Sequence, residues 1–224
     1  MWEEREAITK LVNLKLQNEF GLVKCQIKYM ETIIELINDN KNKENITLLG
    51  IIFTKSYLYS KGIISLFYEN LALEAGALIR PAIEAYELLV YLRKYPENIK
   101  TIQNGQKIEP GKIAKKIDGT FKPLRDYLNK HSSHIDISEL ATNYFIDNDK
   151  NIVCHFTISS DILHDNFMFL STILYLLSFE GAKILEKYQL LDGNGKELLV
   201  KLQSKLYELY DLKKVLGQNA DFIL

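Results

Sequence analysis

Cysteine and long apolar runs are scarce in this chain of 224 residues, and each shortage excludes a class of protein. Two cysteines, far apart in the sequence, cannot form a disulfide framework or a C-x-x-C metal motif. The longest apolar stretches, such as residues 167–179, are interrupted by hydroxyl side chains and are too short to span a bilayer comfortably. We therefore expect a cytoplasmic protein, free of the membrane, whose Cys25 and Cys154 are reduced and buried.

The charge of the chain also limits its function. A formal net charge of -1 excludes a global basic surface for nucleic acid, so such a role would need a local patch. Residues 3–6 are all charged, unlike the apolar segment of a signal peptide. The sequence has no phosphate-binding glycine loop, no dinucleotide fingerprint and no G-x-S-x-G elbow. We expect no cofactor.

Apolar residues recur at helical spacing over most of the chain, which predicts an all-α fold. We expect one domain over residues 1–224, a mainly antiparallel helical bundle with one small β-hairpin near residues 144–156. Gly21 and Pro81 are expected to break or kink the first and third helices. The expected helices cover residues 4–39, 45–69, 71–95, a short helix from 96, 112–117, 122–131, 160–188 and 196–216.

Arg80 and Glu84 form the first candidate site. They lie four residues apart on a predicted helix whose neighbouring residues are small or apolar, so they share one face and are expected to be partly buried. A buried charge needs a partner. The spacing therefore predicts an ion pair that orients packed helices, with ligand binding by Arg80 as the alternative.

Arg125, Asp126 and His131 form the second candidate site, near the end of a predicted helix. A guanidinium stabilises developing negative charge on a phosphate, and an imidazole titrates near neutral pH. Residues 107–134 carry seven basic side chains against three acidic ones, so this segment is a local basic patch that fits RNA. A solvated helix end is the alternative interpretation.

A third cluster contains His155, Asp161, His164 and Asp165. The last three share one helix face and could hold a divalent metal ion, although acidic residues also favour a first helical turn without any metal. His164-Asp165 resembles the dipeptide of HD phosphohydrolases, a helical family that depends on metal. The resemblance implies a further histidine upstream, for which His134 would serve, and a downstream aspartate, Asp192 or Asp211. We nevertheless predict no metal site.

Residues 77–86, A-L-I-R-P-A-I-E-A-Y, and their continuation to Pro96-Glu97 resemble the R-x-x-x-E-A helix of a large group of bacterial helical proteins. That group carries an S-x-x-x-H pattern at a later helix end, where this chain has residues 132–136, S-S-H-I-D. Asp136 stands where the group has its histidine. The resemblance covers about residues 45–180 and implies a bacterial protein of helical fold.

The helical layout and the Arg125-Asp126-…-His131 spacing resemble the HEPN superfamily. Its signature is an arginine, four to six residues and then a histidine, and its members are often dimeric ribonucleases that need no metal. The resemblance implies that Arg125 and His131 form the catalytic pair, across a dimer interface or within one chain, and that Asp126 orients them.

We predict a non-catalytic interaction or regulatory module that binds a protein partner. A HEPN-like ribonuclease or nucleotide-binding protein of a toxin or defence system is the alternative, and an HD-type phosphohydrolase is the second alternative. The helix around residues 51–67 is apolar over much of its circumference. That surface exceeds what a small bundle can cover, so we expect a homodimer.

Overall fold

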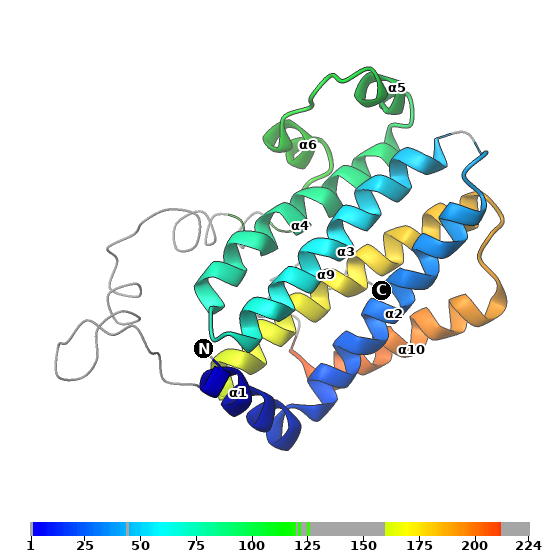
Figure 1. Ribbon diagram of the computed structural model, residues 1–224. Coiled ribbons are helices and arrows are strands. Elements are labelled where there is room, and N and C mark those ends of the chain that lie inside the picture. Colours follow the sequence, from blue (N-terminus) through cyan, green and yellow to red (C-terminus); the bar gives the residue numbers. More distant parts are fainter. Residues whose placement is uncertain (1, 44, 120, 122–124, 126–159, 212–224) are drawn as a thin grey trace.

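The computed structural model describes residues 2–43, 45–119, 121, 125 and 160–211 (Figure 1). Every regular element within these residues is a helix, which confirms the all-α prediction for this part of the chain. The predicted hairpin at residues 144–156 and nearly all of the predicted helix at 122–131 lie outside the described residues.

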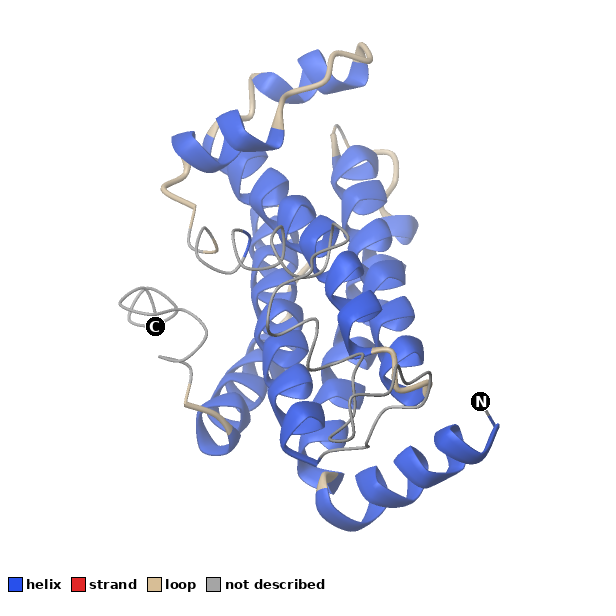
Figure 2. Ribbon diagram, turned by 90° about the vertical axis from the view of Figure 1, so that its left-hand side faces the viewer, coloured by secondary structure: helices blue, strands red, loops and turns tan. Residues whose placement is uncertain are grey.

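Long helices dominate the described part of the chain, and Figure 2 shows several of them lying side by side. Helix α9 lies against α2, α3, α4 and α10, and α3 lies against both α2 and α4. The short helices α5 and α6 follow α4. The helices are α1 (Trp2–Lys15), α2 (Gln17–Asp39), α3 (Ile46–Tyr68), α4 (Ala72–Lys94), α5 (Asn98–Gln103), α6 (Pro110–Lys116), α9 (Ser160–Lys187) and α10 (Gly193–Leu209).

Helix α9 is the central element of the core. Most of its side chains are buried, among them Phe167, Leu174 and Tyr175. It is the one helix among the described residues that is long and apolar enough to cross a membrane, over Leu163–Lys187. Most of that stretch is covered by other helices, as in the core helix of a globular domain.

Two of the close approaches between helices occur at glycines. A β-carbon at Gly181 of α9 would lie 2.7 Å from Phe53 Cε2. A β-carbon at Gly50 of α3 would lie 2.6 Å from Ile37 Cγ2. The missing side chains therefore let α9 and α2 pack closely against α3.

The first predicted helix is two helices, and the break is not at Gly21. Leu16 separates α1 from α2 with φ -125° and ψ 30°. Its side chain is buried, so packing of an apolar residue fixes the bend, while Gly21 stays helical within α2. Pro81 likewise causes no break, because α4 continues through it with Ile79, Ala82 and Ile83 buried against its neighbours.

Two further predictions were wrong. Cys25 is exposed rather than buried, because it lies on the solvent side of α2, whereas Cys154 lies outside the described residues. Helix α10 begins three residues earlier than predicted, since the Asp192 carboxylate accepts a hydrogen bond of 2.7 Å from the Gly195 amide. It ends at Leu209 because Tyr210 is extended and buried.

Candidate functional site

Arg125 lies in an enclosed position against α4. Its Nη1 is 3.3 Å from Glu87 Oε2, and the two side chains are only 15% and 1% exposed. Phe121 anchors the same segment, since its ring packs edge-on against Tyr86 with centroids 5.7 Å apart. Arg125 therefore faces a buried carboxylate, whereas Asp126 and His131 lie outside the described residues.

Glu87 is the buried acid of this cluster. Burial raises the pKa of Glu87 to about 7, an effect that Arg125 opposes and Glu84 reinforces. Gly119 lies directly over it, because a β-carbon there would be 2.8 Å from Glu87 Oε1. The carboxylate is thus enclosed by α4 on one side and by the segment that follows α6 on the other.

Arg80 and Glu84 pair as their spacing predicts. Arg80 Nε donates to Glu84 Oε1 at 3.1 Å, and both side chains are partly exposed. Glu84 and Glu87 are one turn apart on α4, so the pair and the buried acid share one side of the helix. The contact is the predicted pairing of these two side chains, but both lie on α4, so a role in orienting packed helices and ligand binding by Arg80 stay predictions.

The third cluster contains a histidine paired with α2. His164 Nδ1 is 3.1 Å from Glu19 Oε1, and its ring is 5.3 Å from that of Tyr210. Asp161 and Asp165 lie nearby on α9 and are exposed. No group of three or more histidine, cysteine or acidic side chains comes together as a metal site within the described ranges. His134 and His155 lie outside them.

The basic segment 107–134 is described only in part. Lys112 pairs with Glu109 at 3.1 Å on the surface of α6. The Lys116 ammonium lies over the rings of Tyr91 and Tyr95, at 5.9 and 5.3 Å from their centroids. Lys112 and Lys116 therefore have local partners, whereas the side chains of Lys107 and Lys115 are exposed, so the described part of the segment keeps a positively charged surface.

A second buried ion pair, which sequence reasoning missed, joins α4 to α9. Arg93 donates two hydrogen bonds to Glu180, of 2.7 and 3.1 Å, and Glu180 is almost fully buried. The signal was present in the sequence. Glu180 is the one charged residue within the apolar run of residues 167–182, and such a charge needs a partner.

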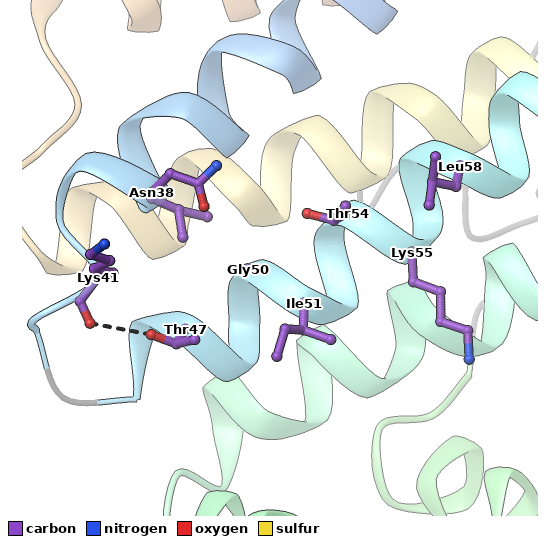
Figure 3. A pocket seen from close by; sticks show the side chains of 9 residues that line it. Asn38, Lys41, Thr47, Gly50, Ile51, Thr54, Lys55 and Leu58 are labelled. Carbon is purple, nitrogen blue, oxygen red and sulfur yellow. Dashed lines mark hydrogen bonds between the residues drawn. The ribbon is translucent and has the colours of Figure 1, made fainter.

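A groove runs along the first half of α3 beside the end of α2 (Figure 3). Its volume is about 370 Å³. Gly50 contributes to its floor, where the missing side chain lets Ile37 approach α3. The lining residues are Ile37, Asn38, Lys41, Thr47, Gly50, Ile51, Thr54, Lys55 and Leu58.

The exposed side of α3 along this groove is apolar. Ile51 is 60% exposed and Leu58 is 58% exposed, and because they are seven residues apart they share one face of the helix. Lys41 and Lys55 are the charged members of the lining, and the described residues that form it include no carboxylate. The groove thus combines an apolar surface with positive charge.

A smaller hollow of about 350 Å³ lies between α2, the end of α9 and the start of α10. Tyr29 crosses from α2 to donate a hydrogen bond of 3.1 Å to the Gly195 carbonyl, which closes that end of the hollow. Five leucines line it, together with polar side chains that include Thr32, Asp192 and Asn194.

The chain matches no known family model, and comparison with curated proteins and with solved structures finds no significant match.

Proposed function

We propose that this chain is a non-catalytic interaction module that binds an apolar helix carrying carboxylates in the groove beside α3. The exposed pair Ile51 and Leu58 carries this proposal. Large apolar side chains that line a groove and face water are typical of a protein-binding surface. Because these two residues lie about two turns apart, a partner helix with an apolar stripe at least two turns long would cover both of them.

The charge of the groove favours an acidic partner. Lys55 lies between Ile51 and Leu58 along α3, and Lys41 lies at the end of α2. Carboxylates flanking an apolar stripe would meet these two ammonium groups at the rim, where opposite charges select partners and speed their encounter. A basic or neutral helix would lack this attraction.

The two enzymatic alternatives have less support from the described side chains. A ribonuclease would need Arg125 to reach a phosphate, but its guanidinium lies against buried Glu87. A phosphohydrolase would need His164 to hold a metal ion, but its Nδ1 lies against Glu19. Both side chains have structural partners, which favours a scaffold role for them.

The same proposal includes the architecture expected from the sequence. We propose a mainly antiparallel helical bundle as the scaffold, a hairpin at residues 144–156 and a bacterial origin in the R-x-x-x-E-A group. In such a scaffold the packed faces of α2, α4 and α9 hold α3 in place, so that its remaining face is free to bind a partner.

A titration with two synthetic helical peptides tests the proposal. Both peptides carry the same leucine stripe, flanked by glutamates in one and by lysines in the other. We expect the glutamate peptide to shift the backbone amide resonances of residues 47–58, and the lysine peptide to bind more weakly. Absence of binding, or shifts confined to other helices, would contradict the proposal.

Two matched variants locate the binding site. Leu58→Asp places a carboxylate on the proposed surface, and Val200→Asp places one at a similarly exposed position on α10. We expect Leu58→Asp to weaken binding of the glutamate peptide about tenfold or more, or about 1.4 kcal/mol. Val200→Asp is expected to leave the affinity unchanged, and equal effects would contradict the assignment.

A further inference from the structure

We infer that the carboxylate-bearing helix that fills the groove is α1 of a second copy of this chain. This inference rests on the proposed function, because it names the partner of the same groove. Three observations support it: the chemistry of the first turns of α1, the position of α1 relative to α3, and the placement of Leu58 along α3.

The start of α1 has the chemistry that the groove selects. Trp2 is 78% exposed, so a large aromatic surface faces water. Glu3 and Glu6 are exposed on the same turns, and Glu6 pairs with Lys10 at 2.8 Å on the surface of α1. Arg5, the cation among them, is paired with Glu69 of α3 at 2.6 Å. The start of α1 therefore presents an exposed tryptophan among three glutamates and two basic side chains, and tryptophan is a frequent anchor residue in interfaces.

The position of α1 fits a pairing of two α3 helices in opposite directions. The Arg5–Glu69 contact holds α1 at the C-terminal end of α3, while the groove lies along residues 47–58 in the first half. Figure 1 shows α1 and the α2–α3 connection at opposite ends of α3. An antiparallel partner would therefore bring its α1 towards the groove of the first copy.

Leu58 would lie close to the symmetry axis of this pair. It is one residue past the middle of Ile46–Tyr68, a helix of about 35 Å at 1.5 Å per residue. In a two-fold interface a residue near the axis lies close to its own copy, so the two Leu58 side chains would meet at the ends of the two filled grooves, while α1 of the other copy covers Ile51. Both grooves would be filled within one closed dimer, so neither groove would remain open to bind a third copy.

Charge reversal at each side of the interface tests the inference. In Lys41→Glu/Lys55→Glu the groove becomes acidic, and in Glu3→Lys/Glu6→Lys the end of α1 becomes basic. Each variant alone would place like charges together at both contacts. An equimolar mixture would place opposite charges together at both contacts, because each copy then meets a complementary partner.

Sedimentation equilibrium on the full chain gives the readout. We expect the wild type to have twice the mass of the 25.9 kDa chain, and each variant to dissociate at least tenfold more readily. The mixture is expected to recover the dimeric mass. Lys28→Glu/Lys205→Glu, at exposed positions outside the groove, is the charge-matched control and is expected to stay dimeric. Circular dichroism checks that every variant is folded.

A monomeric wild type, or a dimer that neither pair of reversals weakens, would overturn the inference. So would a mixture that stays monomeric. If the wild type is monomeric and the glutamate peptide still binds at residues 47–58, the inference fails and the proposed function stands. If neither self-association nor peptide binding occurs, both fail.

Discussion

Glu87 is a carboxylate on α4 that the fold encloses almost completely, with Gly119 and Arg125 packed against it. Burial disfavours the charged form more strongly than Arg125 favours it, so its pKa rises from the ordinary 4.5 to about 7. The folded protein therefore keeps a proton on Glu87 at pH values at which an exposed glutamate is ionised. Such a group changes the stability of the protein with pH whether or not it has any role in binding.

Replacing Glu87 by glutamine should remove this pH dependence. Below pH 4.5 Glu87 is protonated in both the folded and the unfolded chain, but between about 4.5 and 7 only the folded chain keeps the proton. The wild type therefore loses stability as the pH rises through this range. We expect the free energy of unfolding of Glu87→Gln, relative to wild type, to increase by up to about 3 kcal/mol across it.

Urea denaturation at a series of pH values checks this expectation. The quantity to compare between pH values is the difference in unfolding free energy between variant and wild type. Replacing the protonated carboxyl by an amide shifts this difference by an amount that does not depend on pH, whereas the loss of the Glu87 charge, with its attraction to Arg125, changes it with pH. A difference that is the same at pH 4.5 and at pH 8 would contradict the assignment of a raised pKa to Glu87.

Local contacts between side chains could be predicted from the sequence, and distant contacts could not. The Arg80–Glu84 pair follows from helical spacing, because four residues place two side chains on one face. The contact between Arg125 and Glu87 depends on how the chain returns to α4 after α6. The sequence pattern does not predict that return, so it leaves Arg125 open between a phosphate ligand and a solvated helix end. Asp126 and His131 stay predictions, because they lie outside the described residues.

At the scale of helices, the missing side chain of glycine has opposite effects on stability at two positions. Gly21 lies inside α2, where a β-carbon would meet nothing within 4 Å. Gly181 lies inside α9, where a β-carbon would be 2.7 Å from the ring of Phe53 and 3.0 Å from Ile33 Cδ1. The first glycine only weakens its helix, and the second permits close helix packing.

Alanine at these two positions should therefore change stability in opposite directions. Gly21→Ala is expected to stabilise the protein by about 0.5–1 kcal/mol, since alanine is the better helix former. Gly181→Ala is expected to destabilise it by about 1–3 kcal/mol through overpacking. Urea denaturation measures both, and a stabilising Gly181→Ala would show that the helices do not pack at this contact.

Helix positions were largely predictable, whereas helix ends were less so. The apolar periodicity located α3 to within a residue at each end. The helix predicted at residues 4–39 is, however, interrupted at Leu16, because the side chain of Leu16 is buried. No local sequence pattern predicts that burial. Pro81 has the opposite outcome. It removes one backbone donor, yet α4 continues through it, because the residues before and after it are packed in the core.

At the scale of the whole molecule, the expectation of a partner came from the apolar circumference of the helix at residues 51–67. In the structure α3 packs against α2, α4 and α9 and leaves Ile51 and Leu58 in solvent, so the partner that we propose would bind at this one face of α3. The lysines at the rim could not be assigned to this surface from the sequence. Lys41 and the face of α3 lie together only because the chain turns back after α2.

The central claim is that this groove selects apolar helices by their negative charge. The most direct measurement is the ratio of affinities for the glutamate-flanked and lysine-flanked peptides, compared between wild type and Lys41→Glu/Lys55→Glu. We expect the wild type to prefer the glutamate peptide and the variant to prefer the lysine peptide, with the leucine stripe bound by both. An unchanged preference in the variant would contradict it.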